Sequence, residues 1–430
     1  MKRYPHYKPS GIKWIGDVPE HWKAGRLFSA AHEHYISNKN IHNQNLLSLS
    51  YGRIIRKDIN TTDGLLPASF DGYQVVEPNN VVLRLTDLQN DHRSLRVGFA
   101  KEKGIITSAY LCLAPRKNIV PQYLYLYLHT NDVHKVFYGM GGGLRQSLDY
   151  SELRKLTLLI PSHDEQQNIV AFLDLANAKI NKYIAAKQSE IEKLGILKQA
   201  IISRTITRGL NPNAPMKPSG IAWIGDVPSH WKKERLFSVA YEHVISNKNA
   251  HNQNLLSLSY GKIKRKDINT TDGLLPASFD GYQVVEPDNV ILRLTDLQND
   301  HRSLRVGFVT ETGIITSAYL CLASRDNIIP KYLYLFLHIN DIHKVFYSMG
   351  GGLRQSLDYS ELRKLSILIP PLDEQQAIVD YIDRKVGEID KYISKVQEQI
   401  EKLKLYKQRL ISDAVTGKID VRDSVARSAT

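Results

Sequence analysis

The segment GMGGGLRQSLDYSELRKL begins at Gly139 and returns almost unchanged as SMGGGLRQSLDYSELRKL from Ser348, which lies 348 − 139 = 209 positions later. The same interval separates KPSGIKWIGDVPEHWK at Lys8 from KPSGIAWIGDVPSHWK at Lys217. Between residues 8 and 161 about 25 positions differ from the second copy, so roughly five positions in six are identical. Because solenoid repeats span only about 20–50 residues, this interval predicts a tandem duplication of a whole module.

Each copy is predicted to contain a globular part of mixed α/β (α+β) class. Short β-rich runs at 46–50, 80–86 and 104–114 are separated by glycine, aspartate and asparagine turns. The stretch PQYLYLYLHTNDVHKVFYGMGGG, residues 121–143, predicts a helix with Pro121 near its start and glycines at its end. The module is therefore expected to combine strands with at least one helix.

A long helix is expected to follow each globular part. Apolar residues recur there at alternating steps of three and four positions, which is the heptad pattern of a coiled coil. The two series are Ile169, Leu173, Ala176, Ile180, Tyr183, Leu194, Leu197 and Ile201, and Ile378, Ile382, Ile389, Tyr392, Val396, Leu403, Tyr406 and Leu410. Since each helix has a single apolar stripe, the two helices need each other to bury it.

The connection between the copies sets the direction of these helices. Only the short segment RGLNPNAPMKPSG, residues 208–220, separates the first helix from the second globular part. A helix of about 40 residues is about 60 Å long, so the second helix must run back, antiparallel to the first. We therefore predict two globular domains separated by an antiparallel coiled-coil pair of spacer helices, with a pseudo-two-fold axis and with the C-terminus near the N-terminus. The predicted boundaries are 1–160 and 208–369 for the domains, 161–207 and 370–417 for the helices, and 418–430 for a flexible tail.

The composition indicates a polyanionic partner. Lys and Arg total 57 against 44 Asp and Glu, a formal net charge of +13, and no basic tail concentrates this charge, so nucleic acid is the leading candidate. No stretch approaches the roughly 18 uncharged apolar residues of a membrane span, and the N-terminus lacks the apolar run of a secretory signal. Two cysteines cannot build a disulfide framework. We therefore expect a cytoplasmic protein without a membrane association.

Catalytic constellations are missing from the sequence. It contains neither the Asn/Asp-Pro-Pro-aromatic loop of an amino-methyltransferase nor a Walker A phosphate loop. Each half has one cysteine and no His-Glu-x-x-His motif, which argues against a zinc site. The spaced pairs His129/His134 and His338/His343 are expected to be solvated. We therefore expect no catalytic residue and no metal ligand in this chain.

Polar and basic loops supply candidate DNA-binding residues instead. Arg and Lys can bind phosphates or guanine, and Asn and Gln match adenine edges in the major groove. The candidates of the first copy are Arg53, Arg56, Lys57, Asn60, Thr61, Gln89, Asn90, His92, Arg93, Arg96, Arg145 and Gln146. Those of the second copy are Lys262, Arg265, Lys266, Asn269, Thr270, Gln298, Asn299, His301, Arg302, Arg305, Arg354 and Gln355. Matching loops on two domains favour DNA reading over plain solvated loops.

With these features in place, the chain resembles the specificity subunit of type I restriction–modification systems over nearly all of its length. SGIKWIGDVPEHWK from Ser10 is similar to the opening segment of the family's target recognition domains. IPSHDEQQNIVAFLD from Ile160 and IPPLDEQQAIVDYID from Ile369 are similar to the junctions at which those domains pass into spacer helices. The resemblance implies a non-catalytic subunit with two target recognition domains, each reading one half of a bipartite site on double-stranded DNA.

The resemblance also implies partners. These are two methyltransferase subunits and, in the restriction complex, ATP-driven restriction and translocase subunits. S-adenosylmethionine, ATP and magnesium would be bound by those partners, so no cofactor is expected in this chain.

The near-identity of the two domains departs from the family, whose two domains more commonly differ within one subunit. Domains with the same loops should read the same bases, and a two-fold relation between them predicts an inverted-repeat site. Two alternatives stay open at this point. One is a coiled-coil assembly adaptor that does not touch DNA, which the charge balance disfavours. The other is a stand-alone DNA methyltransferase, which would bind its own cofactor.

Overall fold

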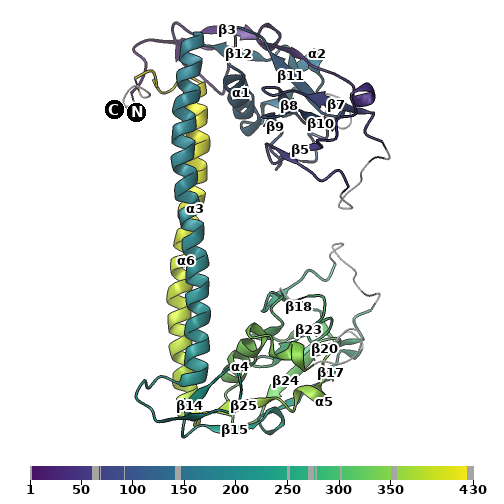
Figure 1. Ribbon diagram of the computed structural model, residues 1–430, viewed down its shortest axis with the longest axis vertical. Helices are drawn as coiled ribbons and strands as arrows, with labels where there is room; N and C mark the ends of the chain where they lie inside the picture. The colour runs from purple at the N-terminus through teal and green to yellow at the C-terminus, as the bar shows by residue number, and fades with distance from the viewer. Residues whose placement is uncertain are drawn as a thin grey trace. The chain divides into compact units, whose positions relative to one another are not determined.

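The computed structural model describes residues 2–60, 67, 69–91, 93–140, 147–248, 252–269, 276, 278–300, 303–349 and 356–423. The chain divides into two compact units. Unit 1 consists of Met1–Gln188 and Gln397–Thr430, and unit 2 consists of Ser189–Val396. Each unit combines one globular domain with part of each of the two long helices (Figure 1).

The domain of unit 1 is built from short antiparallel strands. Its strands are β1 (Tyr7–Pro9), β2 (Asp17–Pro19), β3 (Lys23–Arg26), β4 (Ala31–Glu33), β5 (Leu47–Ser50), β6 (Arg53–Arg56), β7 (Tyr73–Val76), β8 (Val81–Leu83), β9 (Val97–Phe99), β10 (Gly104–Thr107), β11 (Leu111–Pro115) and β12 (Thr157–Ile160). The central sheet has four strands in the order β4-β11-β8-β9, and the pairs β1-β2, β5-β6, β10-β7 and β12-β3 surround it. Helices α1 (Pro121–Val133), α2 (Tyr150–Leu153) and α3 (His163–Arg208) complete the first copy.

The second copy repeats this construction in unit 2. Its strands are β13 (Met216–Pro218), β14 (Asp226–Pro228), β15 (Lys232–Arg235), β16 (Ala240–Glu242), β17 (Ile245–Ser246), β18 (Leu256–Ser259), β19 (Lys262–Arg265), β20 (Tyr282–Val285), β21 (Val290–Leu292), β22 (Val306–Phe308), β23 (Gly313–Thr316), β24 (Leu320–Ser324) and β25 (Ser366–Ile369). Its helices are α4 (Pro330–Ile342), α5 (Tyr359–Leu362) and α6 (Leu372–Val415). The four-stranded sheet β16-β24-β21-β22 matches that of unit 1, so the predicted mixed α/β class and tandem repeat are confirmed.

Helix α1 packs with the central sheet in one hydrophobic core. Leu124 and Leu128 of α1 share this core with Val81 and Val97 of the sheet. Pro121 occupies the first turn as predicted, but α1 ends before the glycines because Lys135 takes a left-handed conformation with φ 60°. The expected stretch 121–143 is therefore one helix of 13 residues followed by a short 3-10 turn.

The predicted solvation of the paired histidines is wrong for His129 and His338. In each ring Nδ1 is buried, and the His129 ring lies 5.8 Å from that of Tyr125. Burial lowers the pKa of both histidines to about 4, and a nearby lysine adds to this effect. Both rings are therefore uncharged at neutral pH.

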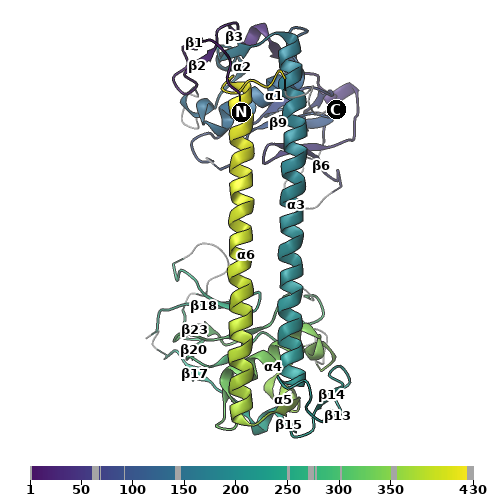
Figure 2. The ribbon, with the colours of Figure 1, turned by 90° about the vertical axis from the view of Figure 1, so that its left-hand side faces the viewer.

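The long helices α3 and α6 run antiparallel, as predicted from the connectivity (Figure 2). In unit 1 the first part of α3 packs with the last part of α6, and in unit 2 the last part of α3 lies with the first part of α6. Lys407 Nζ donates to Asn181 Oδ1 at 3.0 Å in unit 1. In unit 2, Lys198 Nζ forms an ion pair with Asp390 at 2.7 Å.

The buried part of the predicted apolar seam lies mostly beside the globular domains, and Val396 near the middle of α6 is buried as well. Ile169, Leu173 and Ile180 belong to the core of unit 1, and Ile378 and Ile382 belong to that of unit 2. Tyr183, Leu197, Tyr392 and Tyr406 are exposed, so the heptad prediction is wrong for these four residues. Polar contacts join the helices there instead, since Tyr392 Oη donates to Glu190 Oε1 at 2.7 Å.

The opening segment of the first domain and the junction motif at its end meet at the buried carboxylate of Glu165. Its Oε1 accepts from Tyr4 Oη at 2.6 Å and from Trp22 Nε1 at 3.0 Å, and its Oε2 lies 2.9 Å from His21 Nε2. The next residue, Gln166, accepts from the backbone N–H of Val120 at 2.8 Å. The opening segment, the start of α1 and the start of α3 are thus held together.

Unit 2 contains the same junction with one donor fewer. Glu374 accepts from Trp231 Nε1 at 3.1 Å and lies 2.7 Å from His230 Nε2. Asn213, which is exposed, stands where the first copy has Tyr4. The Glu374 side chain is 23% exposed, against 4% for Glu165, so the carboxylate of unit 1 depends more on its partners.

The last residues of the described chain pack into the hydrophobic core of unit 1. Val415, Ile419 and Val421 are part of its hydrophobic core, and the backbone N–H of Asp420 donates to Lys2 O at 2.9 Å. The first and last described segments of the chain therefore lie together, as predicted for the ends of the chain. The predicted flexible tail is wrong for 418–423, because its apolar residues are buried, and 424–430 lie outside the described residues.

Among the helices in the described ranges, none has an apolar stretch long enough to cross a membrane.

Replacing Glu165 with alanine should destabilise unit 1 more than Glu374→Ala destabilises unit 2. The first change removes the acceptor of two buried donors, from Tyr4 and Trp22, whereas the second removes the acceptor of one. A buried donor left without a partner costs about 1–3 kcal/mol, so we expect losses of roughly 2–6 and 1–3 kcal/mol. Amide hydrogen exchange at increasing urea reports each unit separately, and equal losses would contradict this account.

Candidate nucleic-acid interface

A basic β-hairpin, formed by β5 and β6, carries the first group of predicted DNA-binding residues. Ser50 pairs with Arg53, and the two residues between them, Tyr51 and Gly52, have φ of 46° and 76°. Positive φ at both central positions is typical of the turn that suits the twist of a two-residue hairpin. A tyrosine rarely adopts it, yet Tyr51 does so with 76% of its surface exposed.

The hairpin packs against β9, and this places it beside the second predicted segment. A Cβ built on Gly98 would lie 2.6 Å from Leu49 Cδ1 and 2.8 Å from Ile54 Cδ1, so only glycine allows this close approach. A Cβ on Gly52 would lie 3.0 Å from Leu95 Cβ. The structure thus brings together the hairpin and the 84–96 loop, which the sequence separates by some 30 positions.

The 84–96 loop is organised around the buried side chain of Arg96. This guanidinium donates to the backbone oxygens of Thr86 at 2.8 Å and Asp91 at 2.6 Å, and its Nε donates to Tyr138 Oη at 3.0 Å. Further bonds reach the backbone oxygens of Arg84 and Asp87 at 3.2 Å. Arg96 therefore holds the loop in shape.

The expectation that Arg96 and Arg305 contact DNA is wrong. Both side chains are 0% exposed, and Arg305 makes the same set of bonds in unit 2, including 2.6 Å to Asp300 O. A guanidinium whose N–H groups are directed at backbone oxygens and a tyrosine hydroxyl inside the domain cannot reach a phosphate. Sequence alone could not separate these arginines from their exposed neighbours.

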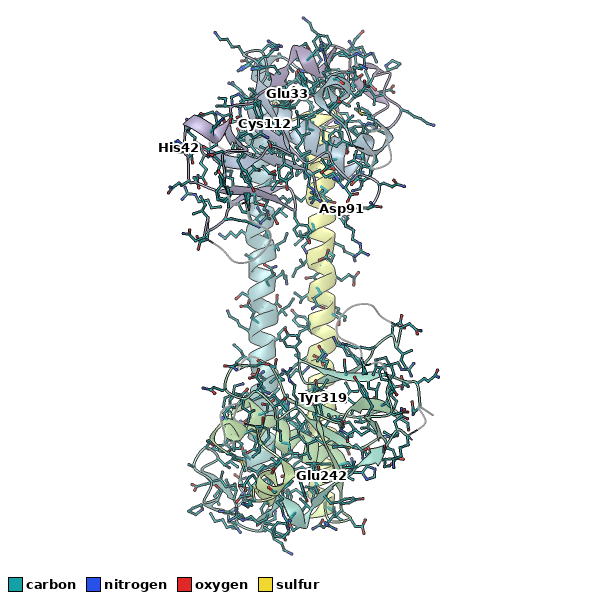
Figure 3. All side chains as sticks on the ribbon, turned by 90° about the vertical axis from the view of Figure 1, so that its right-hand side faces the viewer. Glu33, His42, Asp91, Cys112, Glu242 and Tyr319 are labelled. Atoms are coloured by element: carbon teal, nitrogen blue, oxygen red, sulfur yellow. The ribbon has the colours of Figure 1, made fainter. Side chains whose placement is uncertain are left out.

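A second set of contacts fixes the outer part of the loop. Asp91 Oδ1 accepts from the backbone N–H groups of Ser94 at 2.9 Å and Arg93 at 3.2 Å. Hydrogen bonds from Ser94, first of all from its side chain, lower the pKa of Asp91 to about 2. Asn90 Nδ2 donates to Asp87 Oδ1 at 2.7 Å. Asp91 lies at the edge of unit 1, well away from Glu33 and Cys112 (Figure 3).

Arg56 and its equivalent Arg265 are exposed but each has an acidic partner. Arg56 Nε donates to Glu102 Oε1 at 2.8 Å, and Arg265 Nε donates to Glu311 Oε1 at 2.9 Å. The hydrogen bond from the arginine is the main cause that lowers the pKa of Glu102 and Glu311. Exposed ion pairs are weak, so these arginines can exchange their partner for a phosphate.

The other predicted residues fall into two groups. Exposed on the hairpins and loops are Arg53, Lys57, Asn60, Gln89, Asn90, Arg93, Lys262, Lys266, Asn269, Gln298 and Asn299. Outside the described residues lie Thr61, His92, Arg145, Gln146, Thr270, His301, Arg302, Arg354 and Gln355.

The structure adds exposed residues that the sequence reasoning missed. Tyr51 and Tyr260 stand at the hairpin turns with 76% and 74% of their surface exposed, and Lys264 of the second hairpin is exposed as well. The Tyr-Gly pair between two short β-rich runs is the signal that would have identified the turn. These residues enlarge the basic, partly aromatic surface of each hairpin.

Metal and thiol chemistry have no evident place in this surface. In the ranges that the structure describes, no three His, Cys, Asp or Glu side chains are grouped as a metal site would require. Cys112 and Cys321 are buried, and burial raises the pKa of both thiols to about 12. Both are therefore protonated core residues.

Comparison with known proteins gives a consistent result. Residues 96–193 and 308–402 match the family profile described as the type I restriction modification DNA specificity domain. A protein of Methanocaldococcus jannaschii, named as the MjaX specificity subunit of a type I restriction enzyme, is 25% identical over 325 residues, which cover 73% of this chain and 71% of the relative.

A solved structure shares the fold at low sequence identity. A chain solved in work on complex assembly and conformational transition of the type I R-M system is 13% identical, with 93% of this chain and 98% of that chain covered and a TM-score of 0.63. The HsdS subunit from Thermoanaerobacter tengcongensis is 14% identical, with 94% and 98% covered and a TM-score of 0.48, which is too low to support the fold assignment.

The matched profile covers the junction motif and much of the spacer helix in both copies, and it begins at the last residue of the 84–96 loop in the first copy and after the 293–305 loop in the second. The chain therefore contains two regions, one in each copy, that match the DNA specificity domain of type I restriction–modification systems.

Proposed function

We propose that each unit reads one half of a bipartite DNA site with its basic hairpin and the adjacent loop. In unit 1 these are β5–β6 and residues 84–96, and in unit 2 they are β18–β19 and residues 293–305. The single observation that carries the proposal is that both units present the same exposed basic hairpin, packed beside a loop that a buried arginine holds in shape.

The two parts of this surface suit different tasks. Exposed Arg and Lys side chains of the hairpin can neutralise phosphates, which provides affinity without base preference. The loop presents Gln89, Asn90 and Arg93, whose donors and acceptors can distinguish base edges in the major groove. A loop held rigid by Arg96 loses little conformational entropy on binding, which favours a precise readout.

Both units should read the same bases. RLTDLQNDHRSLRVGF is identical from Arg84 and from Arg293, and the hairpins differ only by Arg53→Lys262 and Ile55→Lys264. The expected two-fold relation between the copies then makes the two half-sites an inverted repeat around an unspecified spacer.

The partners proposed for the chain follow from the same assignment. We infer assembly with two methyltransferase subunits, which would carry S-adenosylmethionine, and with restriction subunits that use ATP and magnesium. Each methyltransferase would flip one adenine, on opposite strands, out of the duplex. Because these components would act together on DNA, we propose that the complex is cytoplasmic.

Mapping N6-methyladenine across a genome that carries this system should show one bipartite motif with inverted-repeat halves. The physical reason is that the same side chains, held in the same loop shape, present the same hydrogen-bonding pattern twice. Deletion of this chain's coding sequence should remove the methylated motif, which is the control. Two unrelated half-sites would refute the inverted repeat, and methylation that survives the deletion would refute the function.

Two arginines of the same loop should respond differently to substitution. Arg93→Ala removes an exposed side chain that would contribute about 1–3 kcal/mol to site recognition. The rate of methylation should therefore fall roughly 5- to 150-fold, while the melting temperature stays within about 2 °C of the wild-type value. Arg96→Met leaves several backbone oxygens without a donor, so the melting temperature should fall by several degrees and site recognition should fail with it.

The measurement pairs thermal unfolding with methylation of a plasmid that carries the mapped site. If Arg96→Met unfolded at the wild-type temperature, the bracing role of Arg96 would be disproved. If Arg93→Ala methylated its site at the wild-type rate, Arg93 would be no part of the reading surface.

A further inference from the structure

The spacer helices carry one equivalent lysine in each unit, beside the globular domain. Lys407 of α6 belongs to unit 1 and Lys198 of α3 belongs to unit 2, and the two are 209 positions apart in the repeat. Lys407 acts electrostatically on His129, and Lys198 acts on His338. Both lysines therefore lie next to the equivalent histidine of α1 or α4, on the side of the helix that faces the domain.

The residue that each lysine contacts on the partner helix differs between the units. Lys407 Nζ donates to the neutral amide of Asn181, Oδ1 at 3.0 Å. Lys198 Nζ contacts both carboxylate oxygens of Asp390, at 2.7 and 2.8 Å. Asn181 and Asp390 occupy equivalent positions of the repeat. This one difference therefore decides whether the lysine has an anionic partner, as Lys198 has, or a neutral one, as Lys407 has.

A second cation lies close to Lys407. Arg53, the first residue of β6, is exposed on the basic hairpin, and its charge adds to burial in lowering the pKa of Lys407. Arg53 also acts on Tyr125 of α1, next to His129. Among the residues that the structure describes, no carboxylate forms an ion pair with Lys407. Arg53 of the hairpin and Lys407 of the helix thus carry like charges that act on one another.

Like charges held close together repel one another, and the repulsion is relieved when an anion binds between them. We propose that Lys407, together with Arg53, binds a backbone phosphate of DNA in unit 1, and that Lys198 in unit 2 does not, because Asp390 already neutralises it. The inference rests on the proposed DNA reading and deepens it. Two domains with the same base-reading loops would then differ in how firmly they hold the DNA backbone.

The test compares Lys407→Gln with its matched control Lys198→Gln. The full chain, with its methyltransferase subunits bound, is titrated with a fluorescein-labelled duplex that carries the mapped site, at several salt concentrations. Each phosphate contact contributes about 0.9 to the slope of log K against log salt. Lys407→Gln should lower the slope by about that amount and reduce affinity about 3.5-fold more at 50 mM than at 200 mM salt. Lys198→Gln should leave the slope unchanged.

Substituting Asn181 and Asp390, the partner residues of the two lysines, distinguishes an effect on DNA binding from an effect on folding stability. Asn181→Asp gives Lys407 the ion pair that Lys198 has, so DNA affinity and slope should fall while the melting temperature stays equal or rises. Asp390→Asn frees Lys198, so affinity and slope should rise. A loss of affinity that merely followed a loss of stability could not produce this opposite pair of effects.

Three results would overturn the proposal while leaving DNA binding intact: equal slopes for the two lysine variants, an unchanged slope for Lys407→Gln, or higher affinity for Asn181→Asp. A wild-type complex that showed no salt-dependent binding to the duplex would instead overturn the proposed function itself. The two failures are therefore distinguishable in one set of titrations.

Discussion

The structure depends on the buried carboxylate of Glu165 and its counterpart Glu374. Removing a carboxylate from water is unfavourable unless charged or polar partners replace the lost hydration, and here an indole, an imidazole and in unit 1 a phenol do so. These donors come from the opening segment, whereas the glutamate begins a long helix, whose N-terminal dipole also favours the negative charge. The domain cannot detach from its helix without leaving that charge unpaired.

The hydrophobic cores of the two units show why each of the duplicated modules needs the other. The core of unit 1 contains Leu410, Val415 and Val421, which belong to the end of the second copy, whereas the core of unit 2 contains Ile202 and Ile206 from the end of the first. Each domain is therefore completed by the helix of the other copy. A duplication that kept both the opening motif and the junction motif preserves this exchange, and changes elsewhere in the helices are tolerated more easily.

Periodicity and connectivity were enough to predict the repeat, the antiparallel helices and the meeting of the termini, because these follow from chain length and apolar spacing. They were not enough to distinguish Arg93 from Arg96, which have the same side chain three positions apart. Only the tertiary position decides which of the two is directed inward. Heptad spacing likewise could not reveal that Tyr183 and Tyr392 stay exposed, since a tyrosine satisfies an apolar pattern while its hydroxyl favours water.

The differences between the two copies affect residues that set charge and spare the residues proposed to read bases. Base readout depends on directional hydrogen bonds, which a single substitution abolishes, and the loop from Arg84 is unchanged at Arg293. Contacts with phosphates depend on charge, which acts over about 8–10 Å at moderate salt and adds up over many side chains. Charge can therefore change one residue at a time without altering the sequence that is read. The copies differ in charge at positions 55 and 181, where Lys264 and Asp390 replace neutral residues, and a chain that reads one sequence twice can still bind its two half-sites with unequal strength.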